Sequence, residues 1–495
     1  MCSSRGATIT DMKLDLFQQS LKQMCGNAVW RLLCDCDRFL NILFPQNPRR
    51  RSLFDRFTSL LEIVLNDGFA SFWRQVSHAL RGSPLSIFLK GTGKRNETEE
   101  MPDVRRRLMV VVGTMGVGGV ERCTAVLLDR LDHALISAEL VTVFDREIFY
   151  PLPSRMKVTI LEEQLCLSLP ADRPLIPDDL QTYARELAWL EMSALKLASI
   201  IRNRRSSVIL AQDYWISIIA LLAKRYVPPT VKVIVTVHCF LSGILPFEKS
   251  GRLLAFLIKT LFKNADGVIA VSEGISLDLM KNFQVPFEKS HTIYNPLNFE
   301  QMQKQAYEPI TEHTWFHEDV PFVLFVGRLS QVKGLDYLLR ALSTIREVMR
   351  VRCVLVGDGA EMAGLKHMAD RLGIGEDVLF LGKQENPFKF MRKAALFVLP
   401  SLFEGLPNVL IEALFCGCPV IAADCQGGGV REILQGGDCG LLVPPEDEKA
   451  LSAAILRLLT DKALRLKFSG LGMQRARDFD SAYSVREYEN IILRN

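Results

Sequence analysis

The sequence predicts an α/β protein with two doubly wound parallel sheets and a helical N-terminal extension. Apolar runs of strand length alternate with helical patterns from residue 105 onward. A second series of the same kind begins near residue 321. Residues 1–104 carry only helical patterns and a polar stretch, so they form a separate region.

The N-terminal region contains two amphipathic patterns, residues 11–44 and 53–80, separated by FPQNPRRRS. Residues 91–104 are polar and charged, which is typical of a linker. The arginines at 49–51 stand beside aromatic helical residues, so this extension could rest on a membrane interface. Packing of the helices against the neighbouring domain is the commoner arrangement and the alternative.

Composition narrows the class of protein. The 495 residues are 48% hydrophobic and 23% charged, which is ordinary for a globular chain. A net charge of +4 is too small to indicate nucleic-acid binding but is compatible with peripheral membrane contact. The start of the chain does not resemble a secretory signal, and the longest apolar run, residues 215–223, is too short to span a membrane. We therefore expect a cytoplasmic protein, with the cytoplasmic face of the membrane as a further site of action.

The 12 cysteines show no Cys-x-x-Cys pair and no regular spacing. We expect them to be reduced core residues, and we expect no metal site.

The first series of predicted strands covers residues 108–112, 138–144, 207–213, 231–238, 267–272 and 291–296. A glycine-rich loop follows the first strand, with a helix opening near Gly119. The loop is neither a dinucleotide fingerprint, because Glu121 replaces the third glycine, nor a Walker loop. It is still a place where a ligand can approach backbone. His238 and Asp213 each end a predicted strand, where ligands bind in such sheets.

The second series covers residues 321–329, 353–359, 378–382, 396–401, 419–424 and 440–445. Two such units predict two Rossmann-like domains facing across a cleft. Arg328 and Lys333 follow the first strand of this series. Two cations near a helix N-terminus could neutralise a diphosphate, although a solvated surface is the simpler explanation of the pair.

Residues 401–419 predict a strand end, a tight loop and a helix over Asn408 to Phe415. Glu404 lies in the loop and Glu412 about two helical turns further on. We expect the backbone amides between Gly405 and Val409 to favour an anion at the helix N-terminus. Two carboxylates for hydroxyls and amides for phosphate suit a nucleotide-sugar.

These motifs resemble one family. GRLSQVKG (327–334), VGDG (356–359), FEGLPNVLIEAL (403–414) and the Gly-Gly-x-x-Glu ending at Glu432 are similar to the retaining nucleotide-sugar glycosyltransferases of family 4, with the GT-B fold. GVGGVER (116–122), TVHCF (236–240), AVSEG (270–274) and IYNP (293–296) match its N-terminal half. The resemblance covers residues 105–495.

The helical pattern of the N-terminal region and this resemblance together predict four parts. Residues 1–104 are the extension and linker, and 105–298 form an acceptor domain. Residues 299–480 form the donor domain, and 481–495 form a helix that crosses back to the acceptor domain.

The resemblance also implies roles for particular residues. Arg328 and Lys333 would hold the donor diphosphate, and Glu412 would bind the ribose hydroxyls. Glu404 would face the donor sugar, and His238 would lie at its anomeric centre. The remaining donor contacts would come from two backbone segments, Gly118 with Gly119 and Gly405 with Leu406, Pro407 and Asn408.

We expect a metal-independent enzyme that uses a UDP- or GDP-linked sugar and a glycan or lipid-linked acceptor, as in cell-envelope polysaccharide or glycolipid synthesis. Two alternatives remain open. One is another GT-B enzyme, such as an epimerase or an inverting transferase. The other is a non-catalytic scaffold on a transferase fold.

Overall fold

The structure is a computed structural model that describes residues 105–144, 148–161 and 178–494. The predicted helical extension, residues 1–104, lies outside the described residues. The fold and site below belong to the unit of residues 104–165 and 188–495, one of two units into which the chain divides.

The first sheet has seven parallel strands in the order β3-β2-β1-β4-β5-β6-β7. Its strands are β1 (Arg106–Val112), β2 (Ile136–Thr142), β3 (Lys157–Ile160), β4 (Val208–Gln212), β5 (Lys232–Val237), β6 (Gly267–Ala270) and β7 (Ser290–Thr292). The helices between them are α6 (Gly119–Arg130), α7 (Asp178–Arg204), α8 (Tyr214–Ala223), α9 (Leu241–Ile244), α10 (Gly251–Leu261) and α11 (Glu273–Phe283). The central strands are fully buried, which explains why they are nearly continuous runs of Val, Ile and Leu.

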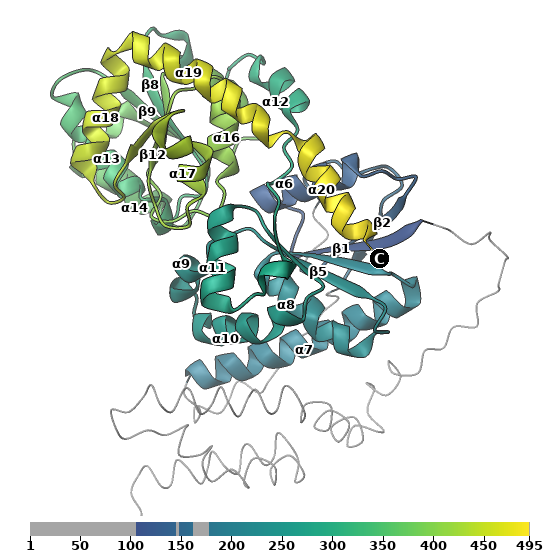
Figure 1. Ribbon diagram of the computed structural model, residues 1–495. Helices are drawn as coiled ribbons and strands as arrows, with labels where there is room; N and C mark the ends of the chain where they lie inside the picture. The colour runs from purple at the N-terminus through teal and green to yellow at the C-terminus, as the bar shows by residue number, and fades with distance from the viewer. Residues whose placement is uncertain (1–104, 145–147, 162–177, 495) are drawn as a thin grey trace, which may run out of the picture. The chain divides into compact units, whose positions relative to one another are not determined.

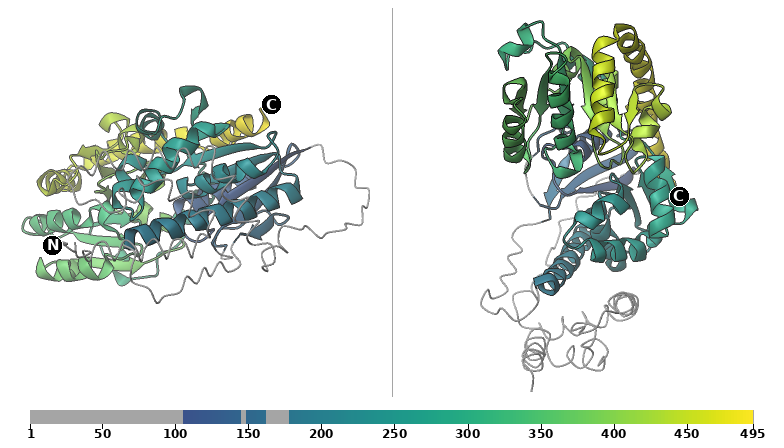
Figure 2. Two further views of the ribbon diagram at one scale, coloured as in Figure 1. Left: turned by 90° about the horizontal axis from the view of Figure 1, so that it is seen from below. Right: turned by 90° about the vertical axis from the view of Figure 1, so that its left-hand side faces the viewer.

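The second sheet has six parallel strands in the order β10-β9-β8-β11-β12-β13. Its strands are β8 (Phe322–Val326), β9 (Arg352–Val356), β10 (Val378–Gly382), β11 (Leu396–Leu399), β12 (Val420–Ala423) and β13 (Leu441–Val443). The helices around it are α12 (Phe299–Ala306), α13 (Leu335–Arg346), α14 (Met362–Arg371), α15 (Phe388–Lys393), α16 (Asn408–Phe415), α17 (Gly429–Ile433), α18 (Glu448–Thr460) and α19 (Lys462–Ala476). Helices cover both faces of this sheet (Figure 2). The predicted pair of doubly wound sheets is confirmed.

Each sheet reverses its strand order at one point, between β1 and β4 in the first and between β8 and β11 in the second. Connections leave in opposite directions there and open a crevice at the carboxyl ends of the strands, where such sheets bind ligands. The glycine loop follows β1, the Arg328–Lys333 segment follows β8, and the Glu404 loop follows β11. Each reversal of strand order is the switch point of its sheet. The candidate residues of the sequence therefore lie at the two switch points.

The last helix, α20 (Ser481–Leu493), packs on β1 and α6 of the first sheet (Figure 1). Val485 and Tyr488 belong to the same buried cluster as Leu108 of β1. The chain thus passes between the sheets twice, and its two crossings meet where Leu297 pairs with Asp480.

Seven cysteines of the described residues are free thiols, and all except the partly buried Cys239 are buried. This agrees with the expectation of reduced core residues. Within the described ranges, no helix is both long enough and apolar enough to cross a membrane.

Candidate active site

The switch point of the second sheet holds an ion pair. Lys333 ends the short 3₁₀ turn after β8, and its Nζ lies 2.6 Å from Oε1 of Glu404 in the loop after β11. Ser401 Oγ donates to the same oxygen at 2.6 Å. Both ionic side chains are largely buried, with exposures of 22% and 11%. The two residues, 71 positions apart in the chain, are therefore neighbours at one point of the site.

The backbone turn at Gly334 makes this pairing possible. Gly334 has φ +60°, and a Cβ there would lie 2.2 Å from the carbonyl oxygen of Pro400. Only glycine tolerates both the left-handed conformation and the close approach. Arg328 lies in the same segment, but its side chain is exposed and has no carboxylate partner within the described part of the chain.

Helix α16 begins at Asn408, as predicted, with Pro407 as the preceding cap residue. No side chain caps this end, so its first amide donors remain available to an anion. Pro407 has no N–H, so the amide donors of this segment come from its neighbours. The predicted contact from Pro407 would have to come from its ring or carbonyl.

The Glu404–Asn408 loop touches the first sheet directly. A Cβ on Gly405 would lie 2.5 Å from the carbonyl oxygen of His238, which immediately follows β5. A Cβ on Gly274 would likewise lie 1.9 Å from the carbonyl oxygen of Gly427. Gly119, at the start of α6, faces the Asn408 side chain. Segments from both sheets thus meet around one site.

The glycine loop carries its own polar contact. Gly118 is the extended cap residue of α6, and a Cβ there would overlap the carboxylate of Glu121. Thr114 Oγ1 donates to that carboxylate at 3.1 Å. A larger residue at position 118 would therefore require the Glu121 side chain to move, and Gly119 is the loop residue that faces α16.

His238 is a neutral imidazole. Its Nε2 lies 2.7 Å from the side-chain amide of Gln212, whose oxygen accepts from a protonated Nε2 and whose NH₂, with the amide turned, donates to an unprotonated one. Burial lowers the pKa of His238 to about 4, partly opposed by Asn295. Nδ1 is buried and has no hydrogen-bond partner. At neutral pH this side chain can orient groups but cannot act as an imidazolium acid.

Glu412 lies one turn into α16 and is almost completely buried, with 1% exposure. It forms an ion pair with Arg122 of α6. Burial raises the pKa of Glu412, and the Arg122 guanidinium opposes that shift. Arg122 also lies over the Phe388 ring, 5.6 Å from its centroid, and lines a cavity of about 360 Å³. The carboxylate expected to bind ribose is thus covered by an arginine from the first sheet's domain.

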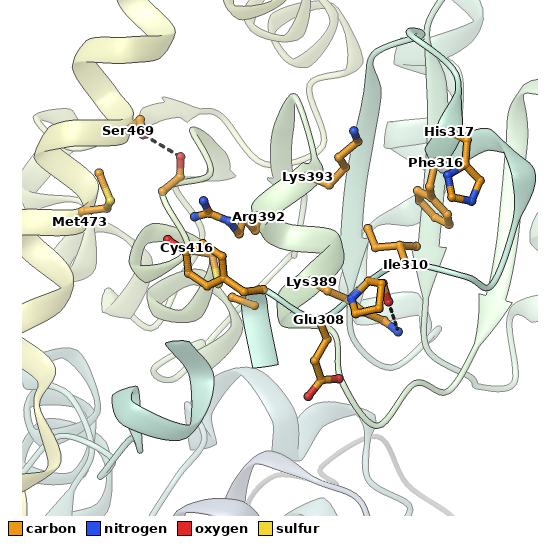
Figure 3. Close-up of a pocket in the computed structure, with 14 residues that line it drawn as sticks. Glu308, Ile310, Phe316, His317, Lys389, Arg392, Lys393, Cys416, Ser469 and Met473 are labelled. Atoms are coloured by element: carbon orange, nitrogen blue, oxygen red, sulfur yellow. Dashed lines mark hydrogen bonds between the residues drawn. The ribbon is translucent and has the colours of Figure 1, made fainter. Parts of the chain in front are cut away.

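A larger open groove of about 590 Å³ lies at the other end of α16 (Figure 3). Lys389, Arg392 and Lys393 of α15 line it, together with Cys416. Arg392 lies over the Tyr307 ring at 3.8 Å. Helices α15 and α16 both end at this groove, so their carbonyl ends oppose a bound anion. A diphosphate is therefore better placed at the N-terminal end of α16, beside Lys333.

Several residues of the site were not foreseen as functional. Arg122 and Asn295 each belong to a quoted motif, GVGGVER and IYNP, but no role followed from the sequence. Gln212 gave no signal beyond its place at a strand end. Within the described residues, no group of three or more His, Cys, Asp or Glu side chains is arranged to hold a metal.

Comparison with solved structures identifies the fold. Sucrose-phosphate synthase from Thermosynechococcus elongatus is 20% identical with a TM-score of 0.62, covering 78% of this chain and 98% of that structure. Anabaena HepE, solved with UDP, is 19% identical with a TM-score of 0.60, and the coverage is the same. The two parallel sheets of this chain therefore have the GT-B arrangement of these structures.

The family follows from the sequence comparisons. Residues 117–301 match Glycosyltransferase Family 4, and residues 320–461 match Glycosyl transferases group 1. The chain belongs to the family 4 glycosyltransferases.

Named relatives agree with this assignment. A Campylobacter jejuni N-acetylgalactosamine-N,N'-diacetylbacillosaminyl-diphospho-undecaprenol 4-alpha-N-acetylgalactosaminyltransferase is 29% identical over 78% of this chain and 100% of its own length. The N-acetyl-alpha-D-glucosaminyl L-malate synthase of Bacillus anthracis is 28% identical over 60% of this chain and 77% of its own length.

Proposed function

We propose that this glycosyltransferase moves a sugar, with retention of anomeric configuration, from a nucleotide-diphosphate sugar to a glycan or lipid-linked saccharide. The observation that carries the proposal is the Lys333–Glu404 pair at the switch point of the second sheet, beside the uncapped N-terminus of α16. It supplies a cation and amides for a diphosphate, and a carboxylate for sugar hydroxyls.

The chemistry follows from these groups. The bond from donor C1 to the diphosphate oxygen breaks, and a bond from C1 to the acceptor oxygen forms on the same face. The departing phosphate oxygen takes the acceptor proton. Negative charge grows on that oxygen, so Lys333 and the amides of α16 stabilise the transition state more than the bound donor. Neutral His238 orients the sugar and is not the proton donor.

The ribose is assigned to Glu412. Because Arg122 covers this carboxylate, the donor must either displace the guanidinium or share the carboxylate with it. Without a nucleotide, Glu412 makes a charge-assisted contact with Arg122. The ribose hydroxyls of a bound nucleotide would take over part of that contact with the carboxylate. UDP or GDP is the expected nucleotide, and we expect the transfer to proceed without a metal.

The acceptor is inferred from relatives. The printed name of the Campylobacter relative specifies a diphospho-undecaprenol-linked acceptor, which supports a lipid-linked acceptor and a role in envelope glycan or glycolipid synthesis. Such an acceptor brings the reaction to the cytoplasmic face of a membrane. Co-sedimentation of the full chain with anionic vesicles tests this contact, and a protein that stays in the supernatant contradicts it.

Donor turnover tests the function. The purified protein is incubated with a panel of UDP-, GDP- and ADP-sugars in EDTA, and release of nucleotide is measured. We expect one donor to turn over, with activity lost in Lys333→Ala and Glu404→Ala. Lys393→Ala, a lysine of the groove in Figure 3, is the matched control and keeps activity. Absence of turnover and of thermal stabilisation by every nucleotide would favour the scaffold alternative.

A further inference from the structure

The contact between Arg122 and Glu412 uses only half of the hydrogen-bonding groups that face each other in such a pair. Nη2 of Arg122 donates to Oε1 of Glu412. Nε, which donates from the same edge of the guanidinium as Nη2, is buried and has no hydrogen-bond partner. Oε2 of Glu412 receives no hydrogen bond from the described residues. An arginine and a carboxylate can form two parallel hydrogen bonds, so this pair leaves one donor and one acceptor over.

The chemistry of the two remaining groups indicates what they bind. A buried donor without a partner is costly, so Nε calls for an acceptor. A hydroxyl suits the pair, because its oxygen accepts from Nε and its proton is donated to Oε2 of Glu412. A water molecule can do the same, and a ligand that takes the place of that water must bring a hydroxyl. A phosphate only accepts and an ammonium only donates, so neither satisfies both groups.

The position of Glu412 on α16 indicates which hydroxyl this is. Glu412 lies one turn, about 6 Å along the axis, beyond the uncapped helix start at Asn408. In the proposed function the donor diphosphate lies at that helix start. The ribose is the group attached directly to the diphosphate, so its hydroxyls are the ones that come within reach of Glu412.

Arg122 is held beside Glu412 by its surroundings. Its guanidinium carbon lies 5.6 Å from the centroid of the buried Phe388 ring. The next residue of α6, Cys123, has its Sγ 3.1 Å from Nδ2 of Asn408. Two neighbouring residues of α6 therefore contact α16 at two points one turn apart. These contacts favour an arginine that shares the carboxylate with the ligand over one that the ligand displaces.

We propose that Arg122 is a donor-binding residue that determines specificity for ribose: one ribose hydroxyl accepts a hydrogen bond from Arg122 and donates one to Glu412. The inference rests on the proposed function for the placement of the nucleotide. The donor shares the carboxylate with the guanidinium and does not displace it. A nucleotide that lacks this hydroxyl leaves both side chains without their partner, so the site rejects deoxyribose.

Binding of nucleoside diphosphates tests the proposal without turnover. Titration calorimetry of the full chain in EDTA measures the Kd of UDP, GDP and ADP. It then measures the Kd of the 2′-deoxy and 3′-deoxy forms of the nucleotide that binds best. Loss of hydrogen bonds to charged groups weakens binding by roughly 10- to 100-fold, and we expect that factor for one of the two deoxy forms. Equal Kd values for all three forms would overturn the proposal.

Arg122→Lys separates the contribution of the arginine from that of the carboxylate. Lysine keeps a positive charge beside Glu412 but replaces the two-donor edge with a single ammonium. We expect weaker binding of the ribose form, and a ratio of deoxy to ribose Kd that falls at least about threefold. Arg130→Lys is the matched control on the same helix and should keep the ratio, because Arg130 Nη2 lies 3.2 Å from Asn298 and Glu300 instead. Arg122→Gln, whose amide can still donate to Glu412, replaces the lysine variant if thermal unfolding shows that the latter does not fold.

The outcomes distinguish this inference from the proposed function. If a nucleotide binds and the ratio is the same in Arg122→Lys as in the unaltered protein, Arg122 does not contact the ribose. If Arg122→Lys binds the nucleotide more tightly, the arginine blocks the site and the donor displaces it. If no nucleotide binds the unaltered protein, the proposed function fails and the ribose contact fails with it. The expected ratios without turnover of any donor would refute the transfer reaction alone.

Discussion

Replacing Gly405 with alanine tests whether the loop of the second sheet must touch the end of β5 during the reaction. Gly405 is not among the glycines with a left-handed backbone, so alanine is compatible with its conformation. The added Cβ would lie 2.5 Å from the His238 carbonyl oxygen and 2.9 Å from Ile275 Cδ1. The substitution therefore acts on the spacing between two segments rather than on local backbone strain.

The magnitude follows from that distance. Ordinary contact for a Cβ begins at 3.4 Å, so the loop and the His238 carbonyl must separate by about 0.9 Å. A displacement of about 1 Å between catalytic groups costs on the order of 100-fold in rate. We expect Gly405→Ala to lower kcat/KM for the donor by roughly that factor, with a small change in thermal stability, because the segments can move apart without opening either core.

The assay is initial-rate nucleotide release, with unfolding followed by circular dichroism. Gly364→Ala is the matched control, since a Cβ at Gly364 in α14 has nothing within 4 Å. Gly274→Ala, whose Cβ would lie 1.9 Å from the Gly427 carbonyl oxygen, should behave like Gly405→Ala. Full activity in Gly405→Ala would show that the reacting state does not need this contact.

Three further changes test the charges and hydroxyls around the site. Burial raises the pKa of Asp213 to about 7 from 3.8. The free energy of unfolding therefore falls as pH rises from 4 to 7, because the folded protein holds a proton on Asp213 that the unfolded chain has lost. Asp213→Asn keeps the cap on α8 and should gain at most about 4 kcal/mol at pH 8 and nothing near pH 4, measured by urea unfolding. Arg122→Met leaves Glu412 buried without its partner, which costs roughly 3–5 kcal/mol at neutral pH and less in acid, where Glu412 is protonated. Adding Glu412→Gln should recover most of that loss, and no recovery would contradict the pairing. Tyr294→Phe removes the hydroxyl that donates to Glu432 at 2.7 Å, so unfolding should show a loss of about 1–2 kcal/mol. A variant as stable as the unaltered protein would rule out that contribution.

Much of the fold could be predicted because parallel strands buried on both faces are apolar throughout. The strand ending before His238 and the helix from Asn408 to Phe415 occur where the sequence predicts them. The strand β3 was missed because its residues, KVTI, are partly exposed at a sheet edge. The predicted strand over 291–296 forms only at Ser290–Thr292, since this short edge strand ends before Asn295 and Pro296.

The site was predictable one segment at a time. Lys333 and Glu404 were selected because each follows a predicted strand. Their pairing depends on the order of the strands in the sheet, which the sequence does not show directly. The Arg122–Glu412 pair joins residues 290 positions apart, one on helix α6 beside the first sheet and one on helix α16 beside the second. No local pattern can reveal such a pair. The same holds for Asn295, whose amide donates to Asn408 at the start of α16 only in the folded chain.

The anomeric configuration of the product tests the central claim most directly. The purified protein is given its preferred α-linked donor and an acceptor, and the new linkage is read by the ¹H coupling of its anomeric proton at early time points. Retention predicts an α linkage that is absent in Lys333→Ala and Glu404→Ala. A β linkage would contradict same-face transfer at this cleft and would support an inverting enzyme on the same fold.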